Sequence, residues 1–111
     1  MEIRFRDKDF QDECNNFKLS KRRQGELRAK KIRRRLDDLQ AANNLEDMRL
    51  LPGRCHELVG NRHGQVSLDL DHPWRLIIIP ADQPPALKPD RGIDWINVRI
   101  IEIQGIEDTH E

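Results

Sequence analysis

The sequence predicts one α+β domain in which N-terminal helices cover one face of a small, twisted, mainly antiparallel sheet. Its 111 residues suit a single domain spanning residues 1–111. Apolar residues recur at three- and four-residue steps in the first part of the chain, as in helices. After Gly53 they alternate with polar residues or form short runs, as in strands. Helices that precede a block of strands are typical of α+β folds.

The N-terminal part is expected to contain one strand and two helices. Apolar alternation predicts a strand over residues 2–5, and helical spacing predicts a short helix over residues 8–17. A longer helix is predicted over residues 21–42, with Ser20 as its N-cap. Gly25 lies inside this helix and should lower its stability by up to ~1 kcal/mol without ending it.

The C-terminal part is expected to contain four consecutive strands. They are predicted at residues 54–59, 66–70, 74–79 and 95–103, with a proline-rich loop over 80–94 and an irregular polar tail from Gly105. The short turns between the first three strands imply antiparallel pairing. The strand at 74–79 is apolar on both faces apart from Arg75, so it should be central. The helices should cover one sheet face and leave the other for function.

Charge is distributed unevenly along the chain. The formal net charge is zero, with 20 basic and 20 acidic residues, but residues 1–40 carry 13 basic and 8 acidic groups. Between Lys18 and Arg35 there are ten basic residues and one acid, Glu26. This pattern predicts a basic helix face. Such a face is either a solvated surface, a binding surface for phosphates, or a docking site for an acidic partner segment.

Several classes of protein are excluded by the composition. No apolar stretch approaches the ~20 residues that cross a membrane, and the N-terminus has no apolar signal-peptide segment. Two cysteines, Cys14 and Cys55, do not make a disulfide framework, and no C-x-x-C or H-x-x-H pair favours zinc. We expect a soluble, cytoplasmic protein with reduced thiols, no metal and no cofactor.

Two residues of the predicted strands suggest chemistry. His56 carries a side chain suited to proton transfer near neutral pH, although a histidine in a strand is often only a polar surface residue. Arg75 interrupts an apolar strand, so it requires either a carboxylate partner or a bound anion. The terminal residues 107–110 are either a polar tail or part of the same site.

These residues belong to a longer stretch that resembles HigB-type killer toxins of the RelE/ParE toxin–antitoxin superfamily. Residues 56–64 match the pattern H-x-L-x-G-x-R-x-G, with His56 first and Arg62 at the arginine. Ser67 follows in the next strand, and Trp74 and Arg75 match a W-R pair before β-branched residues. The resemblance covers about residues 20–110. Its last part is a short match of three residues, in which residues 108–110 resemble a closing D-Y-H motif.

The resemblance implies a RelE-like fold and a metal-independent endoribonuclease that cuts mRNA in the ribosomal A site. It also implies neutralisation by a cognate helix-turn-helix antitoxin of the HigA type. The residues that match catalytic positions are His56, Arg75, Asp108 and His110. The residues expected to contact RNA or the ribosome are Arg28, Lys31, Arg35 and Arg62. His56 and His110 are then expected to lie in one concave site.

The chemistry implied for this set is reasonable, but one position departs from the pattern. Cleavage without a metal needs a base, an acid and a cation that stabilises the phosphorane, and histidines, a carboxylate and Arg75 supply them. The closing tyrosine is Thr109 here, and the chain contains no tyrosine. Two other interpretations remain: a toxin of the same fold that inhibits gyrase by binding, and a degenerate member that only binds protein or nucleic acid.

Overall fold

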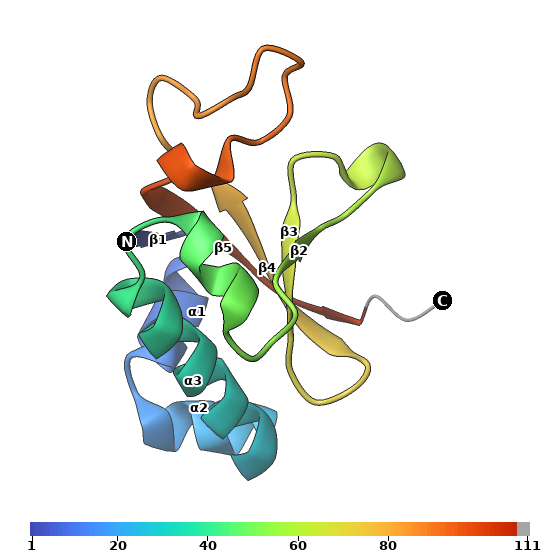
Figure 1. Cartoon of the computed structure of the whole chain (residues 1–111). Helices are drawn as coiled ribbons and strands as arrows, with labels where there is room; N and C mark the ends of the chain where they lie inside the picture. Colours follow the sequence, from blue (N-terminus) through green and yellow to red (C-terminus); the bar gives the residue numbers. More distant parts are fainter. Residues whose placement is uncertain (109–111) are drawn as a thin grey trace.

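The computed structural model describes residues 1–108 and has the expected helical N-terminal part followed by a sheet (Figure 1). The helices and strands, in chain order, are β1 (Glu2–Phe5), α1 (Lys8–Cys14), α2 (Phe17–Gln24), α3 (Glu26–Ala41), β2 (His56–Glu57), β3 (Val66–Asp69), β4 (Trp74–Pro80) and β5 (Ile100–Asp108). Three short 3₁₀ turns, η1 (Leu45–Leu50), η2 (Gly60–Arg62) and η3 (Trp95–Asn97), lie between them. The α+β class is confirmed.

The five strands form one sheet in the order β1-β5-β4-β3-β2. Strands β2 to β5 pair antiparallel with their neighbours, whereas β1 adds in parallel to the outer side of β5. The predicted strand at residues 2–5 and the central position of β4 are therefore confirmed. A β-bulge interrupts the β4–β5 ladder between Ile77 and Ile78, where Gly105 of β5 has a φ of 142°.

The core lies between the helices and one face of the sheet. Helix α3 presents Ile32, Leu36 and Leu39 to this core, which matches the apolar spacing in the sequence. The sheet residues that pack against them are Val66, Leu68, Leu76, Ile78, Ile101 and Ile103. All six are at most 1% exposed, so truncating any one to alanine should lower the free energy of unfolding by about 2–5 kcal/mol.

The other face of the sheet, which we call the open face, lies opposite the helices. Ser67 and Ile77 are opposite each other in the β3–β4 ladder, and both point away from the helical side because their neighbours Leu68 and Leu76 lie in the core. Gly105 continues this row on β5. The register thus confirms that the helices cover one face of the sheet, and a functional role of the other face stays a prediction.

The predicted long helix over residues 21–42 is wrong, because Gly25 ends α2 and precedes α3. Gly25 has φ 83° and ψ 158°, a conformation that residues other than glycine rarely adopt. Helix α2 begins earlier than expected, with Asn16 as its N-cap, and Ser20 is buried within it. The break lets α2 fold against α1, where Gln24 Nε2 donates to the buried Glu13 carboxylate at 3.0 Å. Helix α1 correspondingly ends at Cys14.

The last predicted strand also begins too early. Trp95 and Val98 are both buried, and three-residue spacing brings them to one side of a 3₁₀ turn, which a strand would not do. Trp95 Nε1 donates to Glu57 Oε1 at 2.6 Å and fixes this turn beside β2. Strand β5 then continues through residues 105–108, which we expected to be irregular. Strand β2 is shorter than the predicted 54–59.

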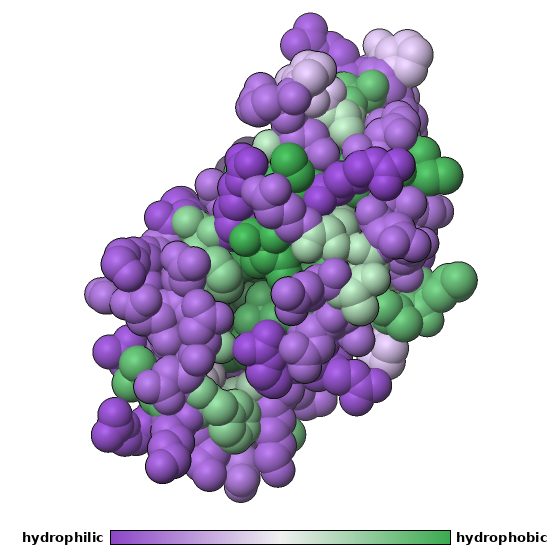
Figure 2. Space-filling view, turned by 90° about the vertical axis from the view of Figure 1, so that its left-hand side faces the viewer, coloured by the Kyte–Doolittle hydropathy of each residue, from purple (hydrophilic) through white to green (hydrophobic). Residues whose placement is uncertain are grey.

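The side of the molecule drawn in Figure 2 is mainly hydrophilic. On the side shown there, apolar residues gather in a central hollow bordered by hydrophilic side chains. A hollow of about 370 Å³ lies beside β1, with Ile3, Phe5 and Leu36 among its lining residues. Within residues 1–108, no helix has the length and apolar character needed to cross a membrane.

Candidate functional site

The register of the sheet places the candidate residues in two neighbouring rows on the open face. His56, Ser67, Ile77 and Gly105 occupy directly opposite positions on β2, β3, β4 and β5. The next row consists of Asp69, Arg75 and Glu107. Residues opposite each other in a sheet share a face and lie ~5 Å apart, so His56 and Arg75 belong to one surface.

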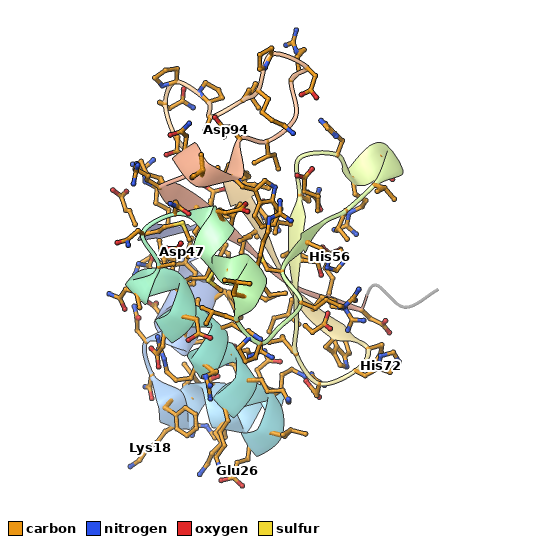
Figure 3. All side chains as sticks on the ribbon, viewed as in Figure 1. Lys18, Glu26, Asp47, His56, His72 and Asp94 are labelled. Atoms are coloured by element: carbon orange, nitrogen blue, oxygen red, sulfur yellow. The ribbon has the colours of Figure 1, made fainter. Side chains whose placement is uncertain are left out.

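His56 is half-buried on β2, and one hydrogen bond fixes its tautomer. Its Nδ1 lies 2.7 Å from the carbonyl oxygen of Arg54. Because a carbonyl oxygen only accepts, Nδ1 must carry the proton, and Nε2 of the neutral ring is left as an acceptor. The arrangement can therefore present a base on the open face. Figure 3 shows His56 well away from Lys18 and Glu26, which lie at the far end of the helices.

Ser67 lies between His56 and Ile77 in the same row. It is 0% exposed, and its Oγ has no hydrogen-bond partner within residues 1–108. A buried hydroxyl without a partner is unfavourable by about 1–3 kcal/mol, which stability alone does not explain. This position is the serine of the sequence motif, so the motif places an unsatisfied polar group directly beside His56.

Arg75 forms an ion pair on the open face. Its Nε lies 2.9 Å from Asp69 Oδ1, and its side chain is only 13% exposed. Arg54 binds the same carboxylate at 3.1 and 3.3 Å. The sequence left open whether Arg75 has a carboxylate partner or binds an anion. The structure shows the carboxylate partner. Asp69 was not singled out in the sequence, although alternation along β3 places it on the same face as Ser67.

Arg62 extends from η2 over the open face. Its guanidinium donates to Gln65 Oε1 at 2.9 and 2.6 Å and to a carboxylate oxygen of Glu107. These side chains line a groove of about 540 Å³. The residues that line it are Arg6, Arg62, Gln65, Gln104, Gly105, Ile106 and Glu107. Of these residues, the sequence predicted Arg62 as an RNA contact and raised Glu107 only as part of the terminal segment 107–110. Arg6 lies far from the motif, and the groove depends on β1 pairing with β5.

Asp108 does not share a face with the other candidates. It is opposite Trp74, which packs against the core on the helical side, whereas Glu107 is opposite Arg75. Glu107 therefore occupies the open-face position at the end of β5. His110 and Thr109 lie outside the described residues, so the proximity of His56 and His110 stays a prediction.

Two of the arginines expected on a basic outer face have partners in the fold instead. Arg28 binds Asp71 at 2.8 and 3.0 Å, and its guanidinium lies 4.5 Å from the Trp74 ring centre. The pKa of Asp71 lies below its ordinary value, mainly because of the hydrogen bond from Arg28. Arg35 is 7% exposed and donates from Nε to the Asp69 carbonyl at 2.8 Å. Placing Arg35 on the outer face was wrong.

The Arg35 side chain packs closely against Gly53. A Cβ added to Gly53 would lie 2.5 Å from Arg35 Nε, and Gly53 has a φ of 112°. The chain therefore needs glycine where it turns towards β2, since the arginine side chain passes directly over it. Lys31 is half-buried, and the exposed cations of α2 and α3 are Lys18, Lys21, Arg22, Arg23, Lys30 and Arg34.

The two cysteines lie outside this site. Cys14 and Cys55 are buried and free, and burial raises the pKa of each thiol to about 12. Each therefore stays protonated near neutral pH and is a poor nucleophile and metal ligand. In the part of the chain that the structure describes, no group of three His, Cys, Asp or Glu residues could hold a metal ion.

Comparison with known proteins supports the fold. No protein-family model matches the sequence, and no curated protein matches it. Among solved structures, a chain of the YoeB-YefM complex from Staphylococcus aureus superposes with a TM-score of 0.57 and 19% identity. The match covers 100% of this chain and 98% of that chain. At this level of identity the match shows the architecture, and the chain has a RelE/YoeB-like fold.

Proposed function

We propose that this protein is the toxin of a type II toxin–antitoxin pair and acts as a metal-independent endoribonuclease on ribosome-bound mRNA. The observation that carries the proposal is the geometry of His56. Its Nδ1 is tied to the Arg54 carbonyl, its Nε2 is left as a base, and Arg62 and Arg75 lie on the same sheet face. The RelE/YoeB-like fold supports it independently.

In the proposed reaction, the 2′-oxygen of one ribose attacks the adjacent phosphorus while His56 Nε2 accepts the 2′-hydroxyl proton. The bond from phosphorus to the 5′-oxygen of the next nucleotide breaks, and that oxygen takes a proton from an acid, for which we propose His110. The products are a 2′,3′-cyclic phosphate and a 5′-hydroxyl. Arg75 would stabilise the extra negative charge on the phosphorane oxygens.

We also propose that a protein partner blocks this site. The structural neighbour is a chain of a two-protein complex, which supports such a partner. The resemblance of residues 54–76 to HigB-type toxins favours a helix-turn-helix antitoxin of the HigA type. The gyrase-inhibiting alternative has less support, because inhibition by binding does not require a histidine with a fixed tautomer on the open face.

The experiment is induced expression of the protein, followed by mapping of mRNA 5′ ends. Cuts in phase with codons would support a ribosome-dependent nuclease, and intact mRNA with blocked replication would indicate the gyrase-inhibiting alternative. His56→Gln should abolish the cuts, because glutamine fits the position but does not accept the proton. His63→Gln is the control, since His63 is an exposed histidine of the turn between β2 and β3. Codon-phased cuts that persist undiminished in His56→Gln would refute the assignment.

A further inference from the structure

Arg6 lies at one side of the open-face groove and has no ion-pair partner among residues 1–108. Its backbone N–H donates to the Ile103 carbonyl at 3.0 Å, which fixes it at the end of β1 beside β5. Its strand neighbour Arg4 differs, because Arg4 Nε binds Glu2 Oε2 at 2.6 Å and does not line the groove. The exposed guanidinium of Arg6 therefore gives the groove an uncompensated positive charge.

Arg62 faces the same groove, but its charge is compensated. Gln65 holds the guanidinium at two nitrogens, and Glu107 binds one of the same nitrogens. Among the residues that the structure describes, Glu107 is the one carboxylate that lines the groove. An arginine fork that accepts a carboxylate oxygen also accepts a phosphate oxygen with similar geometry. Glu107 thus occupies a position that suits a bound anion.

The remaining lining leaves space for such an anion. A Cβ added to Gly105 would meet no atom within 4 Å, so the floor of the groove is open at this point. The Gln65 side chain adds a neutral polar group with N–H donors, whereas the Gln104 Nε2 already donates to the carbonyl and the carboxylate of Glu102. Within residues 1–108, two arginines and one glutamate line the groove, so this lining has a net charge of about +1. This balance suits the single negative charge of a phosphodiester.

We propose that Arg6 and Arg62 form a subsite for one phosphodiester of the RNA strand, and that Glu107 fills this subsite in the free protein. The identity of the ligand rests on the proposed function. Gly105 lies three strands from His56 in the same row, a distance of ~14 Å. Glu107 itself lies opposite Arg75, so the subsite adjoins the cleavage site, and we assign it to the phosphate next to the one that is cleaved. A contact there orients the strand across the open face.

The test is equilibrium binding of a short, fluorescently labelled RNA whose 2′-hydroxyls are all methylated, so that it binds without being cleaved. Arg6→Ala should weaken binding about tenfold and reduce the slope of log affinity against log salt by about 0.7, as expected for one lost phosphate contact. Glu107→Gln should strengthen binding severalfold, because Arg62 no longer has to exchange one anion for another. Arg4→Ala is the matched control, and it should change neither quantity by a comparable amount.

Cleavage is measured separately, with ordinary mRNA on ribosomes. Wild-type affinity in Arg6→Ala, or weaker binding in Glu107→Gln, would overturn the subsite even if the enzyme cleaves. No measurable binding by the wild-type protein at low salt would also overturn it. Conversely, the expected binding pattern without any cleavage would overturn the nuclease function and leave the subsite intact. Thermal unfolding of each variant separates loss of binding from loss of fold.

Discussion

At the scale of single residues, the ion pair between Arg75 and Asp69 raises the question of whether Arg75 stabilises the fold or the transition state. Arg75 is held at 2.9 Å by a carboxylate that Arg54 also binds. We predict that Arg75→Met keeps the fold, because the apolar stem remains and Arg54 still neutralises Asp69. RNA cleavage should fall by ~10²-fold or more if the guanidinium stabilises the phosphorane. The measurements are thermal unfolding and the rate of mRNA cleavage on ribosomes.

The control for this prediction is Arg54→Met. It removes the other guanidinium from the same carboxylate but leaves Arg75 in place, and its side chain is 61% exposed. An equal loss of activity in both variants would contradict a direct role for Arg75, because either arginine would then act only by holding Asp69. Full activity of Arg75→Met would show that the arginine is structural.

At the scale of elements, the separation of α2 from α3 depends on one residue. Gly25 has φ 83° and ψ 158°, and no atom lies within 4 Å of a Cβ placed there. We predict that Gly25→Ala lowers the free energy of unfolding by about 1–3 kcal/mol through backbone strain alone. The melting temperature should fall by roughly 5–15 °C. The measurement is thermal unfolding followed by circular dichroism.

Alanine forms helices better than glycine does, so the same substitution inside an isolated helix would raise its stability. A rise in melting temperature together with more helical signal would mean that residues 17–41 can form one continuous helix. The contact from Gln24 to the buried Glu13 would then have to break. Leu27→Ala is a suitable control, since this exposed residue lies near the break but has ordinary helical geometry.

Some boundaries of these elements could be predicted from the sequence, and others could not. The apolar stripe of α3, the alternation in β3 and the apolar run of β4 are local patterns of the sequence, and those predictions are confirmed. The break at Gly25 depends on α2 packing against α1, and the late start of β5 depends on Trp95 reaching Glu57. Such contacts join residues 11 and 38 positions apart, and local periodicity does not report them.

Likewise, the sequence predicts some residues of the candidate site and misses others. The motif brings His56, Ser67 and Arg75 onto one face, because period-two alternation fixes the direction of each side chain. The bulge at Gly105 and the pairing of β5 with β4 decide that Glu107, and not Asp108, reaches the open face. Arg6 directly follows the first strand, so only the pairing of that strand with β5 brings it to the groove.

At the scale of the whole molecule, helix α2 carries a group of exposed basic side chains, and it lies at the opposite end of the molecule from the loop formed by residues 81–94 (Figure 1). Lys18 and Arg22 are exposed there, and neither has an ion-pair partner within residues 1–108. Reversing both to glutamate changes the net charge by −4 without removing a contact of the core. We predict weaker association with ribosomes at low salt and a smaller salt dependence, because fewer phosphates are neutralised.

The matched control reverses Lys88 and Arg91, two exposed cations of the loop at the other end. This pair changes the net charge by the same −4, so any difference between the two double variants reports the position of the charges. Sedimentation with ribosomes at two salt concentrations measures the association. Equal losses would mean that net charge alone decides binding. No loss in the Lys18 and Arg22 variant would mean that the basic end is only a solvated surface, and ribosome binding would then have to come from the open face.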